Sequence, residues 1–233
     1  MKKALVILVV LVFAACLWIG FDAASKLANG SGGLTVLARN TSPLPAQQHN
    51  LLLVHTTSLD HSQAKLVSVW AAYISFTNPP QMILMPLYPQ AGGDRPAFAT
   101  QTVLDSENRV SDKFIKSVQE TYALPFTGYA LVDSEGVQAF NKWFLNQEIT
   151  LDANIISDPT LQSQVLNASQ QFFTHTCALF EKGDYNPLSK IRWSSILPDH
   201  FRTNLSFETL TLDLEKIVRT SDPVSCRVIL PEK

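Results

Sequence analysis

The sequence is poor in charge and has no region rich in basic residues. Charged residues make up 16% of the 233 residues, the formal net charge is −2, and no lysine or arginine lies between Lys142 and Lys182. A chain with this balance lacks the electrostatic footprint of a DNA- or RNA-binding protein, so nucleic-acid binding is not expected. Hydrophobic residues make up 46%, which is enough for a full core and excludes extended disorder.

The signatures of several common active sites are also missing. The sequence contains no glycine-rich phosphate loop, no GxSxG nucleophile elbow and no HExxH zinc helix. His55 and His61 have a spacing that fits no metal signature, and we expect both to lie in a solvated loop after a first strand. His175 falls within a predicted helix, on its solvent or boundary side. The histidines therefore predict no metal site.

The one long uncharged hydrophobic run lies at the N-terminus, where residues 4–21 follow Lys2 and Lys3. A helix of that length covers roughly 27 Å, close to the ~30 Å hydrocarbon core of a bilayer. Because positive flanks stay inside, we expect residues 1–21 to be a membrane anchor or signal segment. The chain would then be single-pass in the cytoplasmic membrane, with its C-terminal domain extracytoplasmic. A cleaved signal peptide and a lipoprotein signal at Cys16 are the alternatives.

Beyond this segment we expect a flexible tether at residues 22–48 and one folded domain at residues 49–233. Residues 29–33 read NGSGG, and prolines at 43 and 45 favour extended backbone. The domain holds only two cysteines, Cys177 and Cys226. In an oxidising compartment an even pair can form a disulfide, and two buried thiols are the alternative.

Runs typical of strands alternate with amphipathic helical patterns along this domain. Strands are predicted at 51–54, 66–75, 82–85, 126–132, 148–151 and 224–230. Helices are predicted to begin after Ser111, after Asp133 or Ser134, at Pro159, at Asn186 and after Ser206, and the helix from Asn186 is expected to end at Pro198. Residues 89–111 are polar and predict a long surface loop. Together these elements predict an α/β or α+β domain around a single sheet.

The tetrapeptide Asp133-Ser134-Glu135-Gly136 follows a predicted strand and suggests either acid/base chemistry or the start of a helix. Two carboxylates two residues apart in a first helical turn do not face each other, so they form a poor acid/base pair. Asp133 or Ser134 occupies an N-cap position, and Glu135 suits the positive end of the helix dipole. We therefore interpret the tetrapeptide as a capped helix start.

The order of several segments resembles the LytR-CpsA-Psr (LCP) family over residues 50 to 212. The segments are NLLLV from Asn50, LMP from Leu84, LPFTGYALVDSEG from Leu124, EITLD from Glu148, ASQQFF from Ala168 and TNLSFETL from Thr203. The resemblance implies a three-layer α/β/α sandwich with a central mixed sheet, preceded by one transmembrane helix. It also implies transfer of glycopolymers from polyprenyl-pyrophosphate carriers to the cell wall, with arginines, aspartates and Mg²⁺ at the pyrophosphate and an apolar pocket for the prenyl tail.

This sequence departs from the family where the family carries charge. Its Asp-Ser-Arg after the first strand corresponds to Thr57-Ser58-Leu59, its Arg-Ser-Asp before the second strand to Leu66-Val67-Ser68, and its Pro-Arg-Asp after the third to Pro86-Leu87-Tyr88. Loss of a single preorganised donor typically costs about 2.7–4 kcal/mol in the transition state. Thr57, Leu59, Leu87 and Tyr88 therefore predict an inactive site.

We expect a cell-envelope protein that is degenerate for glycopolymer transfer, needs no cofactor, and binds a polyprenyl lipid or an envelope protein. The alternative is a divergent but active transferase that uses Mg²⁺ and replaces the lost arginines with Arg95, Arg109 or Lys113. A periplasmic solute-binding protein is less favoured, because the chain offers one domain rather than two closing lobes. A deep apolar tunnel would favour lipid binding, and a filled core would favour a scaffold.

Overall fold

The computed structural model describes residues 48–90, 95–146, 159–218 and 222–229. No helix within these ranges is long and apolar enough to cross a membrane. The predicted anchor at 1–21, nearly all of the predicted tether and the strand predicted at 148–151 lie outside the described residues. The boundaries of anchor, tether and domain therefore stay predictions.

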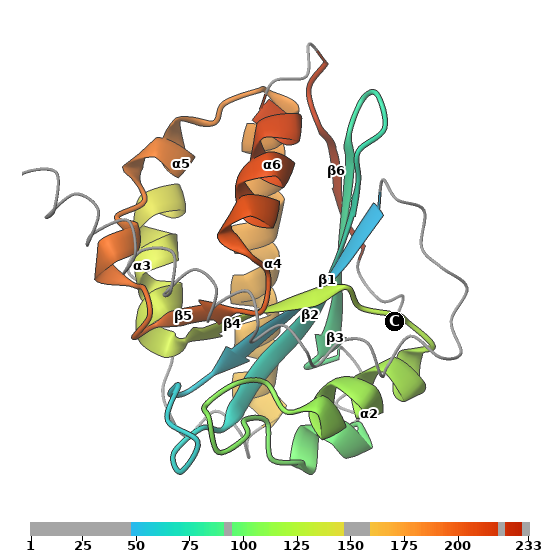
Figure 1. The fold of residues 1–233 in the computed structure, drawn as a ribbon, viewed down its shortest axis with the longest axis vertical. Coiled ribbons are helices and arrows are strands. Elements are labelled where there is room, and N and C mark those ends of the chain that lie inside the picture. The colour runs from blue at the N-terminus through green and yellow to red at the C-terminus, as the bar shows by residue number, and fades with distance from the viewer. Residues whose placement is uncertain (1–47, 91–94, 147–158, 219–221, 230–233) are drawn as a thin grey trace, which may run out of the picture. The chain divides into compact units, whose positions relative to one another are not determined.

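A six-stranded mixed sheet forms the centre of the domain, with strand order β5-β4-β1-β2-β3-β6 (Figure 1). The strands are β1 (Gln48–Thr56), β2 (Leu66–Ser75), β3 (Gln81–Tyr88), β4 (Gly128–Asp133), β5 (Phe201–Thr203) and β6 (Ser225–Val228). β1 pairs with β4, and β3 with β6, in parallel; the other neighbours are antiparallel. The α/β architecture with a mixed sheet is thus confirmed.

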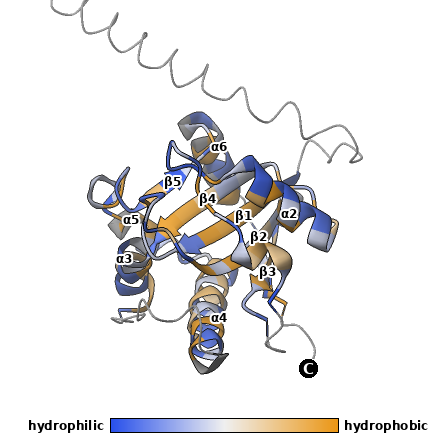
Figure 2. Ribbon diagram, turned by 90° about the horizontal axis from the view of Figure 1, so that it is seen from below, coloured by the Kyte–Doolittle hydropathy of each residue, from blue (hydrophilic) through white to orange (hydrophobic). Residues whose placement is uncertain are grey.

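Helices cover both faces of this sheet, because side chains alternate between the faces along each strand. Val69 and Ala71 of β2 face α2 (Asp112–Tyr122) and the short 3₁₀ helix η2 (Ala97–Thr100). Trp70 and Ala72 face α4 (Pro159–Glu181) and α6 (Phe207–Val218). Figure 2 shows α2 and α4 on opposite sides of the largely hydrophobic strands.

Helix α3 (Ser134–Leu145) follows β4 directly and lies beside α4, where the Phe144 and Phe172 rings are 5.7 Å apart. A disulfide joins Cys177 of α4 to Cys226 of β6, with the Cα atoms 5.0 Å apart. Of the two alternatives for these cysteines, the structure therefore has the bridge, which ties a helix to an edge strand.

Two predictions about irregular segments are wrong. Phe98 and Leu104 are buried in the core beside α2, so residues 89–111 do not form a surface loop throughout. The helix expected from Asn186 to Pro198 ends at Lys190, as α5 (Asn186–Lys190), and the 3₁₀ helix η3 (Trp193–Ser195) and β5 follow it. In both segments isolated apolar residues without a clear period are held by tertiary contacts, which local patterns do not reveal.

Candidate functional site

The carboxyl ends of the parallel strands β1 and β4 lie side by side, with Thr56 paired to Asp133. This is the edge of an α/β sheet where ligands commonly bind. Helix α3 begins at Ser134, so its N-terminal amides lie at the same edge. Strand β5 adds to the outer side of β4 and brings His200 next to Asp133.

Of the two N-cap candidates that the sequence offers, Asp133 and Ser134, the structure has Asp133 as the cap of α3. Its Oδ1 accepts a hydrogen bond of 2.8 Å from the backbone N–H of Gly136. Gly136 is required by close packing, since a Cβ at this position would lie 2.6 Å from the carbonyl oxygen of His200. The tetrapeptide therefore caps the start of α3 and packs closely against the segment that precedes β5.

The second carboxylate oxygen of Asp133 binds His200, with Oδ2 and Nδ1 2.9 Å apart. The other imidazole nitrogen, Nε2, lies 3.4 Å from Oε2 of Glu135. The hydrogen bond from Asp133 raises the pKa of His200 above its ordinary 6.5, partial burial opposes this, and the charges of Asp133, Glu135 and Asp199 add to it. The Glu135 side chain is 76% exposed, so solvent screens its contribution.

His55 is buried in β1, so the prediction that it lies in a solvated loop is wrong. The strand continues past its apolar run because His55 pairs with Ser68 of β2 and with Val132 of β4. Its Nε2 lies 3.3 Å from Oγ of Ser134. Burial lowers the pKa of His55 to about 3, so the imidazole is neutral at physiological pH. His61, in contrast, is exposed in the loop as predicted.

Ser134 and His55 are placed like a nucleophile and its base, but their chemistry does not match that role. A general base must accept the hydroxyl proton, and an imidazole with a pKa about 3 accepts it poorly at neutral pH. The carboxylate of Asp133 is bound to His200 and to the α3 backbone. The pair is better suited to joining β1 to α3 than to nucleophilic catalysis.

Four of the six positions at which the family resemblance places charged residues lie in packed or internally bonded surroundings. Leu59, Leu87 and Tyr88 are 4%, 0% and 2% exposed and belong to the core beside α2. Burial raises the pKa of the Tyr88 phenol, and the nearby Arg95 charge opposes this. Thr57 Oγ1 donates to the carbonyl of Gln63 and accepts from the backbone N–H of Lys65. These positions provide neither a fixed charge nor open space.

The three basic residues that could replace the family's arginines are all exposed. Arg109 forms ion pairs with Asp105 at 3.2 Å and Glu107 at 3.0 Å, and its hydrogen bond to Asp105 raises its pKa. Arg95 donates to the carbonyl of Ala99 at 3.4 Å, and Lys113 lies in the first turn of α2. Since the acids beside Arg109 offset its charge, Arg109 supplies little of the positive field that a pyrophosphate needs.

Arg202 of β5 is a residue near the edge that the sequence did not single out. Its guanidinium donates to the carbonyl oxygens of Pro198 at 3.2 Å, Asn108 at 3.0 Å and Leu59 at 3.5 Å. It therefore holds three loops together, although they are far apart in the sequence. A single arginine in a three-residue strand gives no pattern from which this role could be predicted.

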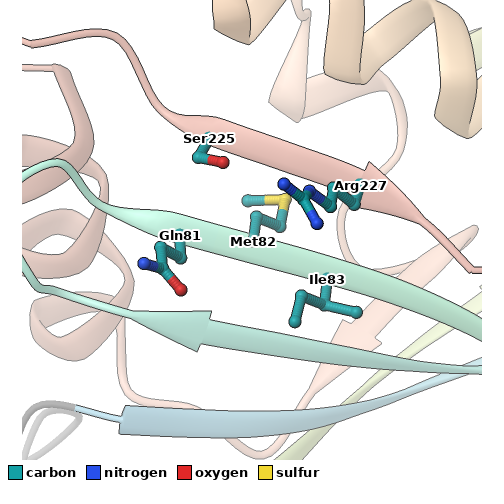
Figure 3. A pocket seen from close by; sticks show the side chains of 5 residues that line it. All are labelled: Gln81, Met82, Ile83, Ser225 and Arg227. Atoms are coloured by element: carbon teal, nitrogen blue, oxygen red, sulfur yellow. The ribbon is translucent and has the colours of Figure 1, made fainter.

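Within the described residues, no group of three or more histidine, cysteine or acidic residues could hold a metal. A small hollow lies between β3 and β6 (Figure 3). Its volume is about 180 Å³, and Gln81, Met82, Ile83, Ser225 and Arg227 line it. Because Gln81 and Ser225 open their strands, the hollow lies at the amino ends of the strands. It holds roughly six waters at ~30 Å³ each, which is too small for a polyprenyl chain.

No protein-family model and no curated protein matches this chain. Similar solved structures include TagT bound to LIIa-WTA, with 12% identity over 82% of each chain and a TM-score of 0.47. The transcriptional regulator yvhJ from Bacillus subtilis has 15% identity over 81% of this chain and 85% of that chain, with a TM-score of 0.42. Their identities and TM-scores are too low to carry an argument about site or activity.

Proposed function

We propose that this chain is a membrane-anchored, extracytoplasmic LCP-like protein of cell-envelope assembly that has lost glycopolymer transfer and acts as a partner-binding module. The observation that carries the proposal is the burial of Leu59, Leu87 and Tyr88 in the core, at positions where the family resemblance places charged residues.

The chemistry of the lost reaction explains why this observation matters. A pyrophosphate in a protein site needs cations or a metal in place of water, since unpaired buried charge is costly. Mg²⁺ in turn needs carboxylates or phosphates as ligands. Neither leucine nor a buried phenol supplies such a group. A ligand phosphate at these positions would meet apolar side chains at van der Waals contact.

The packing beside α2 favours a protein partner over a polyprenyl lipid. The Phe98 ring lies 6.5 Å from Tyr88, 5.8 Å from Phe114 and 6.1 Å from Tyr122. Tyr88, Phe98 and Phe114 are almost completely buried. A prenyl tail on this face of the sheet would have to displace these rings, whereas a partner can bind the outer surface without disturbing the core.

A surface suited to such a partner lies around Trp193 and Leu197, which are 45% and 43% exposed. The Trp193 ring packs against Phe140 of α3 and Phe201 of β5, at 6.4 and 6.1 Å, and the exposed Arg192 precedes it. Tryptophan and arginine are enriched in the energetic centres of protein interfaces. A photo-crosslinking residue at position 193 should therefore yield an adduct in intact cells, while one at the exposed position 175 on α4 should not.

The test of lost ligand binding is a calorimetric titration of the full chain with geranyl pyrophosphate, with and without Mg²⁺. We expect no saturable, Mg²⁺-dependent heat. Saturable binding that needs Mg²⁺ would overturn the proposal. If replacing Arg95 or Arg109 by alanine then abolished that binding, the alternative of a divergent active transferase would take its place.

The proposed anchor has a separate test. If residues 1–21 hold the chain in the cytoplasmic membrane with Lys2 and Lys3 inside, the domain lies outside the cytoplasm. Protease added to intact spheroplasts should then digest the domain. Complete protection, with digestion only after lysis, would contradict this topology.

A further inference from the structure

The segment Ile196–Phe201 is held against the start of α3 by backbone and side-chain bonds that meet at His200. The His200 carbonyl accepts from the backbone N–H of Asp133 at 3.2 Å, and the His200 N–H donates to the Ile196 carbonyl at 2.8 Å. The imidazole lies between the carboxylates of Asp133 and Glu135. One side chain thus connects the end of β4, the first turn of α3 and the segment before β5.

The charges that face His200 are mainly acidic. Asp133 belongs to β4, Glu135 to α3 and Asp199 to the same loop as His200. The nearest basic neighbour in sequence, Arg202, directs its guanidinium to backbone carbonyls. His55, which contacts the adjacent Ser134, is buried and neutral. A positive imidazole is therefore stabilised by the acids around it, whereas a neutral imidazole leaves their negative charges unbalanced.

We propose that Asp133, His200 and Glu135 form a pH-sensitive clasp that fastens the segment Ile196–Phe201 to α3 in acid and loosens it in mild alkali. A protonated imidazole has two N–H groups, one for Asp133 and one for Glu135. A neutral imidazole keeps one N–H on Nδ1 for Asp133 and turns the Nε2 lone pair towards Glu135. The clasp weakens in this way without breaking, because the backbone bonds remain.

The direction of the effect follows from linkage. The folded pKa of His200 is raised above 6.5 by its bond to Asp133, so protonation stabilises the closed clasp. That stabilisation is complete below pH 6.5 and is lost as the pH rises through the folded pKa. The equilibrium constant for opening the clasp changes about tenfold for each pH unit by which the pKa of His200 in the closed form exceeds its pKa in the open form.

The consequence should be visible at Trp193. Its ring packs on Phe201, the residue after His200, at 6.1 Å, and the Trp193 carbonyl accepts from the Leu197 N–H at 2.8 Å. Loosening the clasp would therefore change the surroundings of an exposed tryptophan as well as those of His200. Trp70 lies in the core on β2 and provides an internal reference.

The experiment uses the full chain in mild detergent, labelled with 5-fluorotryptophan and with ¹³C-histidine. The His200 and Trp193 resonances are followed by NMR from pH 5.5 to 9, and assigned by their loss in His200→Gln and Trp193→Phe. We expect His200 to titrate above pH 6.5, Trp193 to shift with the same midpoint, and Trp70 to stay constant. His200→Gln should abolish the Trp193 shift, and His175→Gln, a matched change at an exposed site on α4, should preserve it.

Glu135→Gln is the second variant, since it replaces an exposed side chain and should not prevent folding. It should lower the midpoint of both resonances together. A His200 midpoint at or below 6.5 would overturn the proposal. So would a Trp193 resonance that stays constant through the His200 titration, or one that still shifts in His200→Gln.

Discussion

Nε2 of His55 lies 3.3 Å from the hydroxyl of Ser134, so a buried histidine joins strand β1 to the first residue of α3. Burial lowers the pKa of this imidazole to about 3, whereas in the unfolded chain it has the usual value of about 6.5. Between pH 3 and 6.5 the His55 imidazole is therefore protonated in the unfolded chain and neutral in the folded chain. The free energy of unfolding should fall as the pH drops from 6.5 towards 3.

Replacing His55 by glutamine should remove this acid sensitivity. Glutamine does not titrate, and its amide can bond to Ser134 in place of Nε2. Each pH unit over which only the unfolded chain is protonated costs at most about 1.4 kcal/mol, so wild type should lose on the order of 2 kcal/mol more than the variant between pH 6.5 and 5. Urea unfolding at both pH values measures the difference. His175→Gln should behave like wild type, and an unchanged difference in His55→Gln would contradict the assignment.

Asp133 has two roles, which two substitutions can separate. Alanine removes both the cap on Gly136 and the partner of His200. Asparagine keeps a capping oxygen and removes the charge. Asp133→Ala should therefore be less stable than Asp133→Asn by about 0.5–2 kcal/mol, the usual value of an N-cap. Thermal unfolding at pH 8, where protonated His200 contributes less, gives the comparison, and equal stability of the two variants would show that the cap contributes nothing.

Gly136→Ala should destabilise the fold although alanine is the better helix former. The added Cβ would lie 2.6 Å from the His200 carbonyl oxygen and 2.7 Å from Cγ2 of Val132. Such overpacking typically costs about 1–3 kcal/mol, more than the ~1 kcal/mol that alanine gains in propensity. Glu135→Ala, one residue earlier and exposed, should change the unfolding free energy little at pH 8. A Gly136→Ala protein that unfolds at a higher denaturant concentration than wild type would contradict the packing argument.

The bridge between Cys177 and Cys226 spans 49 residues of sequence. By the chain-entropy model, closing a loop of this length stabilises the fold by roughly 4 kcal/mol. The double variant Cys177→Ala/Cys226→Ala should lose most of that amount in equilibrium unfolding and should show no further loss when reductant is added. Non-reducing peptide mapping of the wild type should find the linked peptides, and free thiols at both Cys177 and Cys226 would contradict the bridge.

The strands and helices that have a clear hydrophobic periodicity or a clear capping residue could be predicted from the sequence. Ser111 caps α2 as expected, and Asp133, one of the two expected candidates, caps α3, because N-capping depends on residues near each other in the chain. The run from Leu66 to Ser75 is a strand over its whole predicted length. Local patterns were enough wherever the physical cause was local.

The contacts of the candidate site could not be predicted in the same way. His200 meets Asp133 across 67 residues of sequence, and His55 meets Ser134 across 79. Both depend on the lateral order of β5, β4 and β1, which no single-strand pattern encodes. The burial of Phe98 has the same origin, since η2 is fixed by its contact with α2 rather than by its own period.

The central claim, that glycopolymer transfer has been lost, is tested most directly by a turnover assay. The full chain is incubated with a polyprenyl-pyrophosphate-linked glycan, Mg²⁺ and cell-wall acceptor, and the release of polyprenyl phosphate is measured. With Leu59, Leu87 and Tyr88 buried where the family resemblance places charge, we predict release no faster than in a control without protein. Mg²⁺-dependent release above that control would contradict the account, and its loss on replacing Arg95 and Arg109 by alanine would show that those arginines had taken over the site.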